Sequence, residues 1–324
     1  MYESFYGFKE KPFSLLPDPG FIYLGEKHSS AYAMLEYGLM NKAGFTVITG
    51  EVGSGKTTLI RRLLDQIDDD VTVGLISNTP KDIGQLLQWV LMAFDQEFRE
   101  ENQVVLYEAF NQFLIDQYAQ NKHSVLIIDE AQNLHPHVLE ELRMLSNINV
   151  DKYQVLQVIL VGQPQLLDLL KKPELLQIRQ RITSDYYLKP LDREETGHYI
   201  LHRVWLAGVQ RHVFDQGAVD LIFEASRGVP RIINVLCDTA LVYGFAEQAD
   251  QIDKEIVQAV LDDKMNAGGL IIASENDEEA LEESSEVESP VFQRARQKVP
   301  VARKKKAKPP ALDKNTIKHL FSKD

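Results

Sequence analysis

The chain has little of what secreted or membrane-spanning proteins need. A single cysteine, Cys237, among 324 residues excludes an internal disulfide, and its apolar helical surroundings predict a buried, inert thiol. No apolar run approaches the roughly 20 residues of a membrane-spanning helix, and residues 270–273 are far too few. The first residues lack the basic region and the apolar core of a signal peptide. These absences suit a protein of the reducing cytosol.

A surplus of positive charge is also missing, since the formal net charge is −13. Residues 266–324 hold 11 Lys and Arg against 10 Asp and Glu, so the acidic surplus lies in residues 1–265. A body this acidic is a poor general binder of polyanions, which leaves only local basic patches for that role. The hydrophobic content of 44% is ordinary for a globular protein.

The most informative stretch runs from residue 50 to residue 58. It follows a β-branched run at 45–49 and leads into a helical pattern at 59–64, the setting of the phosphate-binding pattern G-x-x-x-x-G-K-[ST]. Glycines allow successive backbone N–H groups to face one point, where the helix N-terminus adds partial positive charge. The stretch consists of Gly50, Glu51, Val52, Gly53, Ser54, Gly55, Lys56, Thr57 and Thr58.

Two side chains of this loop suit a nucleoside triphosphate and its magnesium ion. The Lys56 ammonium can reach the β- and γ-phosphates, and the Thr57 hydroxyl can ligate Mg²⁺. The alternative is a glycine-rich turn that precedes a helix by chance, which does not account for both correct flanks. The chain is therefore predicted to bind a nucleoside triphosphate.

Strands and helices alternate over residues 44–190, after a lead-in of residues 1–43 with a helical pattern at 29–40. Apolar strands that alternate with helices predict an α/β fold, a parallel sheet flanked by helices on both faces. Strand candidates are 45–49, 71–77, 124–129, 155–161 and 183–188, and helical stretches lie near 56–66, 82–94, 102–120, 136–147 and 164–180.

Beyond residue 190 the strands stop. Helical patterns near 192–206, 215–226, 230–247 and 253–264 predict a small all-helical domain over residues 191–265. In residues 266–324 the composition changes, with eight carboxylates in 275–288 and eight Lys and Arg in 294–308. Charge blocks of this kind predict a disordered tail, acidic and then basic.

A second phosphate-related pattern is the apolar run 125–128 that ends in Asp129 and Glu130. A buried parallel strand places Asp129 at the carboxyl edge of the sheet, where ligands of α/β proteins bind. Asp129 then holds Mg²⁺ opposite Thr57, and Glu130 is a candidate general base for the attacking water. The alternative is a core strand followed by a solvated acidic turn. The pairing with the loop at 50–58 favours nucleotide hydrolysis.

The strand at 157–161 ends in Gly162-Gln163-Pro164. If this strand lies beside the one that ends at Asp129, Gln163 can hydrogen-bond the attacking water or the γ-phosphate. The alternative is a glycine–proline turn with an incidental amide.

Three arginines are candidates for contact with the γ-phosphate. Arg179 and Arg181 stand at a helix end before a strand, a position suited to a finger that reaches a neighbouring subunit, although surface ion pairs explain them equally well. Arg231 follows Gly228-Val229-Pro230, so a turn and a proline at the helix start direct its side chain. In the helical domain Arg231 can cap the γ-phosphate and report hydrolysis as a lid motion.

Three other sequence patterns give weaker functional signals. His135 and His137 flank Pro136, but no thiol or third ligand stands nearby, which favours polar loop residues over a metal site. The basic run at 303–308 fits either nucleic acid or anionic lipid, or a solvated tail. Residues 316–321 form a faint candidate for a short docking helix.

The motifs resemble, in the same order, the general secretion pathway protein A (ExeA-type) family. The resemblance covers roughly residues 1–265 and rests on a run of motifs rather than on one. The motifs that carry the resemblance are residues 5–8, 11–13, 17–19, 37–39 and 44–45, the loop at 50–58, Asp129-Glu130-Ala131-Gln132-Asn133-Leu134, and residues 162–164, 180–182, 199–203 and 228–234.

This resemblance implies an AAA+ ATPase that forms oligomers and uses ATP to assemble a type IV pilus or a type II secretion apparatus. It implies Gln163 as sensor 1, Arg231 as sensor 2, and Arg179 or Arg181 as the finger acting in trans. Long members continue into a transmembrane helix and a peptidoglycan-binding domain, which residues 1–324 do not contain. The chain is more similar to short members, such as the MshM-type pilus biogenesis ATPase.

The leading hypothesis is a homo-oligomeric ATPase of the cytoplasm, or of the inner membrane's periphery, that uses ATP and Mg²⁺ to drive pilus or secretion machinery. The ATPase module also resembles transposition helpers of the TniB/TnsC type, so a DNA-associated ATPase with a nucleic-acid-binding basic tail is the second hypothesis. The third is a nucleotide-gated adaptor that binds ATP without turnover.

Overall fold

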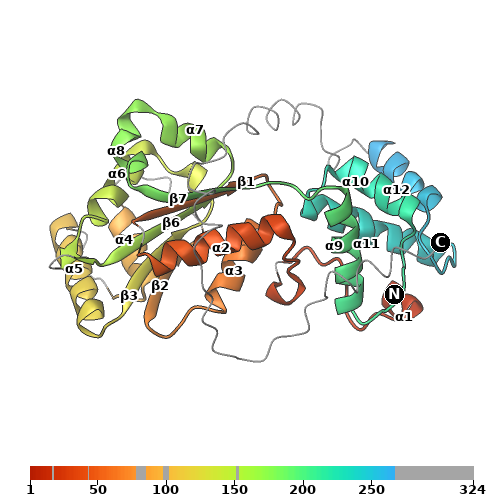
Figure 1. Cartoon of the computed structure of the whole chain (residues 1–324), viewed down its shortest axis with the longest axis horizontal. Coiled ribbons are helices and arrows are strands. Elements are labelled where there is room, and N and C mark those ends of the chain that lie inside the picture. The colour runs from red at the N-terminus through yellow and green to blue at the C-terminus, as the bar shows by residue number, and fades with distance from the viewer. Residues whose placement is uncertain (17, 43, 78–84, 98–101, 151–152, 267–324) are drawn as a thin grey trace, which may run out of the picture. The chain divides into compact units, whose positions relative to one another are not determined.

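The computed structural model describes residues 1–266 apart from 17, 43, 78–84, 98–101 and 151–152 (Figure 1). The predicted charged tail lies outside the described residues from 267 onward, and with it the basic run and the candidate docking helix at 316–321. The beginning of the helix predicted at 82–94 lies outside them as well.

A five-stranded parallel sheet forms the centre of the α/β region, which confirms the predicted strands to within one or two residues. The strands are β1 (Phe45–Gly50), β2 (Val71–Ile76), β3 (His123–Ile128), β6 (Leu156–Gly162) and β7 (Ile182–Leu188). They lie in the order β2-β3-β6-β1-β7, and every pair is parallel. Because β6 lies between β1 and β3, their carboxyl ends meet at one edge of the sheet.

Both faces of this sheet are buried, as the apolar strands predict. In β6, Val158 and Leu160 belong to the apolar cluster on one face, whereas Ile159 and Val161 belong to the cluster on the other. Helices α2 (Glu26–Met40) and α3 (Lys56–Leu64) cover the second face, and α4 to α8 cover the first (Figure 1). Those helices are α4 (Leu86–Ala93), α5 (Gln103–Ala119), α6 (Pro136–Leu145), α7 (Gln165–Lys171) and α8 (Leu176–Arg179).

The prediction of one helix over 164–180 is wrong. Helix α7 ends at Lys171, and a 3-10 turn at Pro173–Leu175 separates it from α8. Proline lacks the N–H that continues a helix, and it forces the preceding Lys172 into extended backbone, with ψ 140°. A short antiparallel pair, β4 (Asn149–Val150) with β5 (Tyr153–Gln154), was not predicted.

Four helices follow the sheet: α9 (Arg193–Leu206), α10 (Gln216–Ser226), α11 (Pro230–Ala246) and α12 (Lys254–Asn266). A capping box between Asp192 and Glu195 starts α9. We call these helices, with the chain start that packs on them, the helical region. Among the described residues no helix has the length and apolarity that a bilayer crossing requires.

The start of the chain packs into the core of the helical region rather than onto the sheet. Helix α1 (Tyr2–Tyr6) and the residues after it contribute five aromatic side chains to the apolar cluster that α9 to α12 enclose. These are Tyr2, Tyr6, Phe8, Phe13 and Phe21. Cys237 lies fully buried in the same cluster, which confirms the predicted burial, and burial raises the pKa of its thiol.

Candidate functional site

The glycine-rich loop joins β1 to α3, the strand–loop–helix setting that its sequence predicts. Gly53 and Gly55 have φ of +80° and +99°, a backbone conformation that side chains disfavour. A Cβ on Gly50 would lie 2.8 Å from the carbonyl oxygen of Leu188, so this glycine lets the loop start close against β7. The amides of the first turn of α3 have no acceptor within the helix and are available to an anion.

Lys56, the first residue of α3, is buried with its ammonium at the loop. Its Nζ donates to the carbonyl oxygens of Gly50 at 2.7 Å and Glu51 at 2.8 Å. Burial lowers the pKa of this ammonium, and the nearby carboxylates of Glu130, Asp129 and Glu51 counteract part of that effect. The side chain is therefore held by backbone groups of the loop it is predicted to serve.

Thr57 and Asp129 meet across the carboxyl edge of the sheet. The Thr57 hydroxyl donates to Asp129 Oδ2 at 2.9 Å, and the backbone N–H of Glu130 donates to Asp129 Oδ1 at 2.9 Å. A hydroxyl and a carboxylate are hard oxygen donors of the kind Mg²⁺ prefers, and Mg²⁺ keeps several waters and phosphate oxygens as its other ligands. The two predicted metal ligands thus fit a magnesium ion shared with a nucleotide.

Glu130 lies directly beyond β3 with its carboxylate held by two amides. Its Oε2 accepts from Gln132 Nε2 at 2.6 Å and from Gln163 Nε2 at 3.2 Å. Gln132 also accepts the backbone N–H of Gln163 at 3.0 Å, and a Cβ on Gly162 would lie 2.8 Å from Gln132 Oε1. The strand of Gln163, β6, lies beside β3, the arrangement on which its predicted role depends, and this brings Gln163 to Glu130.

Arg231 lies at the start of α11, and its backbone touches the phosphate loop. Its N–H donates to the carbonyl oxygen of Gly53 at 3.2 Å, and a Cβ on Gly53 would lie 2.5 Å from Arg231 Cβ. The preceding Gly228 has φ +74°, and a Cβ there would lie 1.8 Å from the carbonyl oxygen of Leu191. Glycine at 53 therefore allows α11 to contact the loop closely, and glycine at 228 allows the turn before α11 to pack against Leu191.

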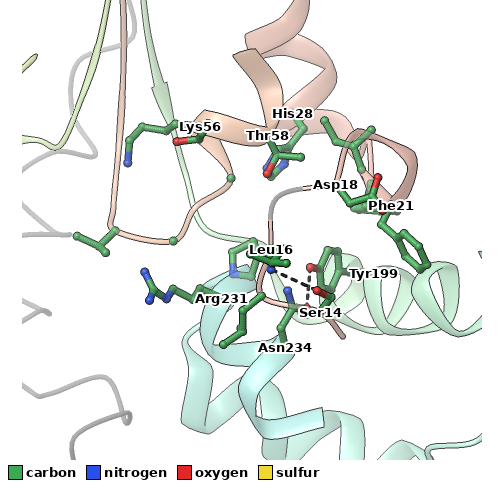
Figure 2. A pocket seen from close by; sticks show the side chains of 18 of the residues that line it. Ser14, Leu16, Asp18, Phe21, His28, Lys56, Thr58, Tyr199, Arg231 and Asn234 are labelled. Carbon is green, nitrogen blue, oxygen red and sulfur yellow. Dashed lines mark hydrogen bonds between the residues drawn. The ribbon is translucent and has the colours of Figure 1, made fainter. Parts of the chain in front are cut away.

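A cavity of about 350 Å³ extends from the loop between the two regions. Lys56, Thr57, Glu130, Gln163 and Arg231 all line it. Figure 2 shows Lys56 and Thr58 from α3, Tyr199 from α9, and Arg231 and Asn234 from α11 around it. Its remaining wall comes from the lead-in, including Ser14, Leu16, Asp18 and Phe21.

Several residues that line the cavity were not predicted as site residues, although Tyr199, Arg203 and Asn234 lie in segments that carry the family resemblance. Tyr199 donates its hydroxyl proton to Asn234 Oδ1 at 2.8 Å and accepts from buried Arg203 at 2.8 Å. Arg203 also donates to the carbonyl oxygen of Pro12 at 2.5 Å, which holds the lead-in against α9. His28 and Gln132 were also missed. Gln132 does not line the cavity and had a signal as part of the motif at 129–134, whereas His28 had none.

Arg179 and Arg181 do not line this cavity in the described part of the chain. Arg179 is exposed at the end of α8, where its guanidinium donates to the carbonyl oxygen of Lys171 at 3.5 Å. Arg181 donates to Ser146 Oγ at 3.1 Å and lines a separate polar cavity of about 280 Å³. Arg179 is the last residue of α8 and Arg181 directly precedes β7, the predicted position at a helix end before a strand, and neither lines the cavity at the phosphate loop.

His135 and His137 have local structural partners. The His135 ring caps α6 by accepting the backbone N–H of His137 at 3.2 Å, and His137 lies 3.1 Å from the carboxylate of Glu141. No group of three metal-ligating side chains occurs among the described residues. His137 therefore belongs to the first turn of a helix and not to the loop that the sequence suggested.

The class of protein follows from the fold, the loop and a family match. Residues 39–170 match the family model described as an AAA domain. The parallel sheet flanked by helices, with a glycine-rich phosphate loop after β1, is the P-loop fold of AAA+ proteins.

Over 253 residues the chain is 39% identical to general secretion pathway protein A of Aeromonas hydrophila, which confirms the resemblance that the motifs predict. The match takes in 78% of this chain and 46% of the relative, so the chain spans about half of that protein. Among solved structures, the ORC2 protein of Aeropyrum pernix has a similar fold, with a TM-score of 0.60, 18% identity, and coverage of 78% of this chain and 71% of that one.

A Walker-type ATPase of Pyrococcus abyssi is similar too, with a TM-score of 0.57 and 19% identity. That match covers 85% of this chain and 80% of the other. At identities this low, the similarity to both solved structures supports the fold alone.

Proposed function

We propose that the chain binds ATP with Mg²⁺ and hydrolyses it to ADP and phosphate. The observation that carries this proposal is the meeting of Thr57, Asp129 and Glu130 beside a glycine-rich loop. Thr57 and Asp129 are hydrogen-bonded to each other, and Glu130 follows Asp129 directly. A magnesium ion held by Thr57 and Asp129 would supply neutralisation of phosphate charge. Adenine is assigned from the family resemblance.

The residues divide the work of phosphoryl transfer between them. Lys56 binds the β- and γ-phosphates, and the loop amides of residues 50–58 hold the phosphate chain in place. Glu130 accepts a proton from the attacking water through its Oε1. Oε1 is available for this because both amide donors contact Oε2. Gln163 orients the water or the γ-phosphate.

Arg231 supplies positive charge from the helical region. Because its backbone already contacts Gly53, a change at the γ-phosphate is transmitted to α11 over a short path. We propose that the helices of residues 191–265 act as a lid domain whose position depends on the bound nucleotide.

The test compares Glu130→Gln with Lys56→Ala. Glu130→Gln retains ATP binding and loses turnover, with kcat lower by about 10²–10⁴, since it removes the base and keeps the shape. Lys56→Ala weakens binding and turnover together. Phosphate release and ATP titration of both purified variants measure this. A Glu130→Gln protein with full turnover would contradict the base assignment, and a wild type that binds ATP without turnover would support the adaptor hypothesis.

A homo-oligomer completes the proposed site with Arg179 or Arg181 of a neighbouring subunit. Both guanidinium groups stand away from their own phosphate loop, and both precede β7. An arginine-finger variant mixed with Lys56→Ala regains activity if the finger acts in trans, because each subunit supplies what the other lacks. Running the mixture with Arg179→Ala and then with Arg181→Ala identifies the finger, and no recovery with either removes the trans mechanism.

The cellular role proposed here is assembly of a pilus or a secretion apparatus at the cytoplasmic face of the inner membrane. The 39% identity to general secretion pathway protein A supports it, over about half of that protein. Loss of pilus or secretin assembly in a Glu130→Gln strain supports the role, and normal assembly contradicts it. DNA-stimulated hydrolysis that falls steeply with salt and disappears when 294–308 is deleted would favour the DNA-associated alternative.

A further inference from the structure

His28 lies in the first turn of α2 and contacts the phosphate loop from outside the sheet. The residue is only 5% exposed, and its Nε2 lies 3.0 Å from the carbonyl oxygen of Ser54. A carbonyl oxygen only accepts hydrogen bonds, so Nε2 carries the proton and donates it. Glycine at 55 makes this approach easy, because a Cβ there would lie 3.1 Å from His28 Nε2.

The contact determines which way the next amide faces. Peptide bonds of the described residues are trans, and in a trans peptide the C=O and N–H point in opposite directions. With the Ser54 carbonyl held toward α2, the N–H of Gly55 points away from α2. Gly55 caps α3, so this N–H has no acceptor within the helix. It belongs to the set of amides that a glycine-rich loop offers to phosphate.

Ser54 lies between two glycines, so the orientation of the Ser54–Gly55 peptide needs such a restraint. Gly53 and Gly55 both have positive φ, and glycine backbone adopts alternative conformations at low cost. The other peptide of Ser54 is already fixed, since its N–H donates to the carbonyl oxygen of Glu51 at 3.1 Å. His28 therefore supplies a hydrogen bond to the Ser54 carbonyl from outside the loop.

The imidazole acts through geometry and not through charge. Burial lowers the pKa of His28, which favours the neutral ring. Among the described residues Nδ1 has no hydrogen-bond partner, which fits a ring that donates from Nε2 alone. A neutral ring adds no positive charge to a phosphate site, so its contribution is the direction of the Ser54–Gly55 peptide.

We propose that His28 is a positioning residue, which locks the Ser54–Gly55 peptide with the Gly55 N–H directed into the phosphate cradle. The proposal rests on the proposed nucleotide binding and deepens it. It concerns the phosphate chain alone, so it applies to any nucleotide and to a polyphosphate without a base.

The experiment compares His28→Leu, which keeps the bulk and removes the donor, with His28→Gln, whose amide N–H reaches a similar distance. Both are made in the Glu130→Gln background, so that bound nucleotide stays intact, and titrated with ATP, GTP and inorganic tripolyphosphate in the presence of Mg²⁺. His28→Leu weakens each of the bound ligands by about tenfold, the effect of one hydrogen bond to a charged group. His28→Gln stays within about threefold of the parent.

The outcomes separate this inference from the proposed function. A parent protein that binds none of the ligands contradicts the nucleotide site itself. If the parent binds and His28→Leu binds equally well, or loses ATP while keeping tripolyphosphate, His28 does not position the phosphate cradle. Failure of His28→Gln to restore binding also contradicts the donor role.

A second measurement keeps the proposal testable if His28→Leu does not fold. In wild-type protein labelled with ¹⁵N-histidine, His28 is assigned by the signal that His28→Gln lacks. We expect the neutral tautomer with the proton on Nε2, and a shift of that signal when tripolyphosphate binds. A proton on Nδ1, or a signal indifferent to tripolyphosphate, overturns the proposal.

Discussion

The α/β region and the helical region build their cores from the chain in different ways. Apolar clusters on the two faces of the sheet draw on elements that follow one another between residues 31 and 188. The helical cluster instead joins α9 to α12 with aromatic residues from the first 21 positions. Two distant parts of the sequence therefore make one core, and both parts, together with the phosphate loop, line the cavity of the candidate site.

The two regions also differ in what they bring to the site. The α/β region supplies the loop and the polar groups after β3 and β6, all attached to a buried sheet. The helical region supplies Arg231, Tyr199 and Asn234, attached through α9 and α11. A rigid sheet suits chemistry that needs fixed distances, and a separate helical core suits a part whose position responds to the nucleotide.

Equivalent core substitutions give the sharpest test of this division. Phe110→Ala in α5 and Phe13→Ala in the lead-in both truncate nearly inaccessible rings, so each lowers the free energy of unfolding by about 3–5 kcal/mol. Hydrogen exchange distinguishes them. We expect Phe13→Ala to reduce protection mainly in α9 to α12 and Phe110→Ala mainly in the sheet and α5. Equal loss of protection in both regions for each variant would show a single cooperative core.

Gly228→Ala tests how tightly α11 is fixed where the regions join. Positive φ and a Cβ placed 1.8 Å from the Leu191 carbonyl oxygen force the backbone to shift, at a cost of about 2–4 kcal/mol. Urea unfolding measures that cost, and the KM for ATP rises because Arg231 moves.

Gly197→Ala in α9 is the matched control for this substitution. Its Cβ meets only a side chain, at 3.5 Å, and alanine favours a helix by up to about 1 kcal/mol. A Gly228→Ala protein as stable as this control would contradict the close packing at Leu191.

A smaller effect is expected from the charged contact between α2 and the start of α9. Lys27 Nζ lies 2.7 Å from Glu195 Oε2 and donates to the carbonyl oxygen of Pro190 at 2.9 Å. The two charged side chains are 25% and 12% exposed, so a double-mutant cycle of Lys27→Met and Glu195→Gln gives a coupling of about 1 kcal/mol. The exposed pair of Lys171 and Asp168 serves as control, with a coupling near zero. Equal coupling energies for the two pairs would contradict a stabilising role of the Lys27–Glu195 contact.

Acidification affects both regions by the same mechanism. Burial lowers the pKa of His123 in the α/β region and of His202 in the helical region. Below the ordinary histidine value of about 6.5, the unfolded chain binds protons that the folded chain does not, so stability falls as the pH falls. Urea unfolding at pH 7.5 and 5.5 measures the slope. We expect His123→Gln and His202→Gln each to flatten it, and an unchanged slope in both would contradict these assignments.

The α/β region was predictable from sequence because its signals are local. Apolar runs such as 125–128 predict buried strands, and the loop at 50–58 requires glycines at particular positions. Asp129 and Glu130 follow from the end of one strand. Pro173 was the missed local signal, because the apolar periodicity of 164–180 continues across it.

In the helical region the packing partners could not be predicted from the sequence. Its helices were predicted from periodicity, but no local pattern among the aromatic residues at 2–21 indicates which helices they pack against. His28 gave no signal either, because its function depends on contact with Ser54, 26 residues away. Gln132 was visible only as part of a motif, and the bond to Gln163 required the neighbouring strand.

By itself, the sequence determined most of the elements, the phosphate loop and the acidic pair after β3, because hydrophobic periodicity and glycine geometry act over a few residues. Only the tertiary structure decided that β6 brings Gln163 to Glu130, that Arg231 touches Gly53, and that the chain start completes the helical core. These contacts join residues far apart in the chain, and they depend on how apolar faces find burial in three dimensions rather than on any neighbouring residue.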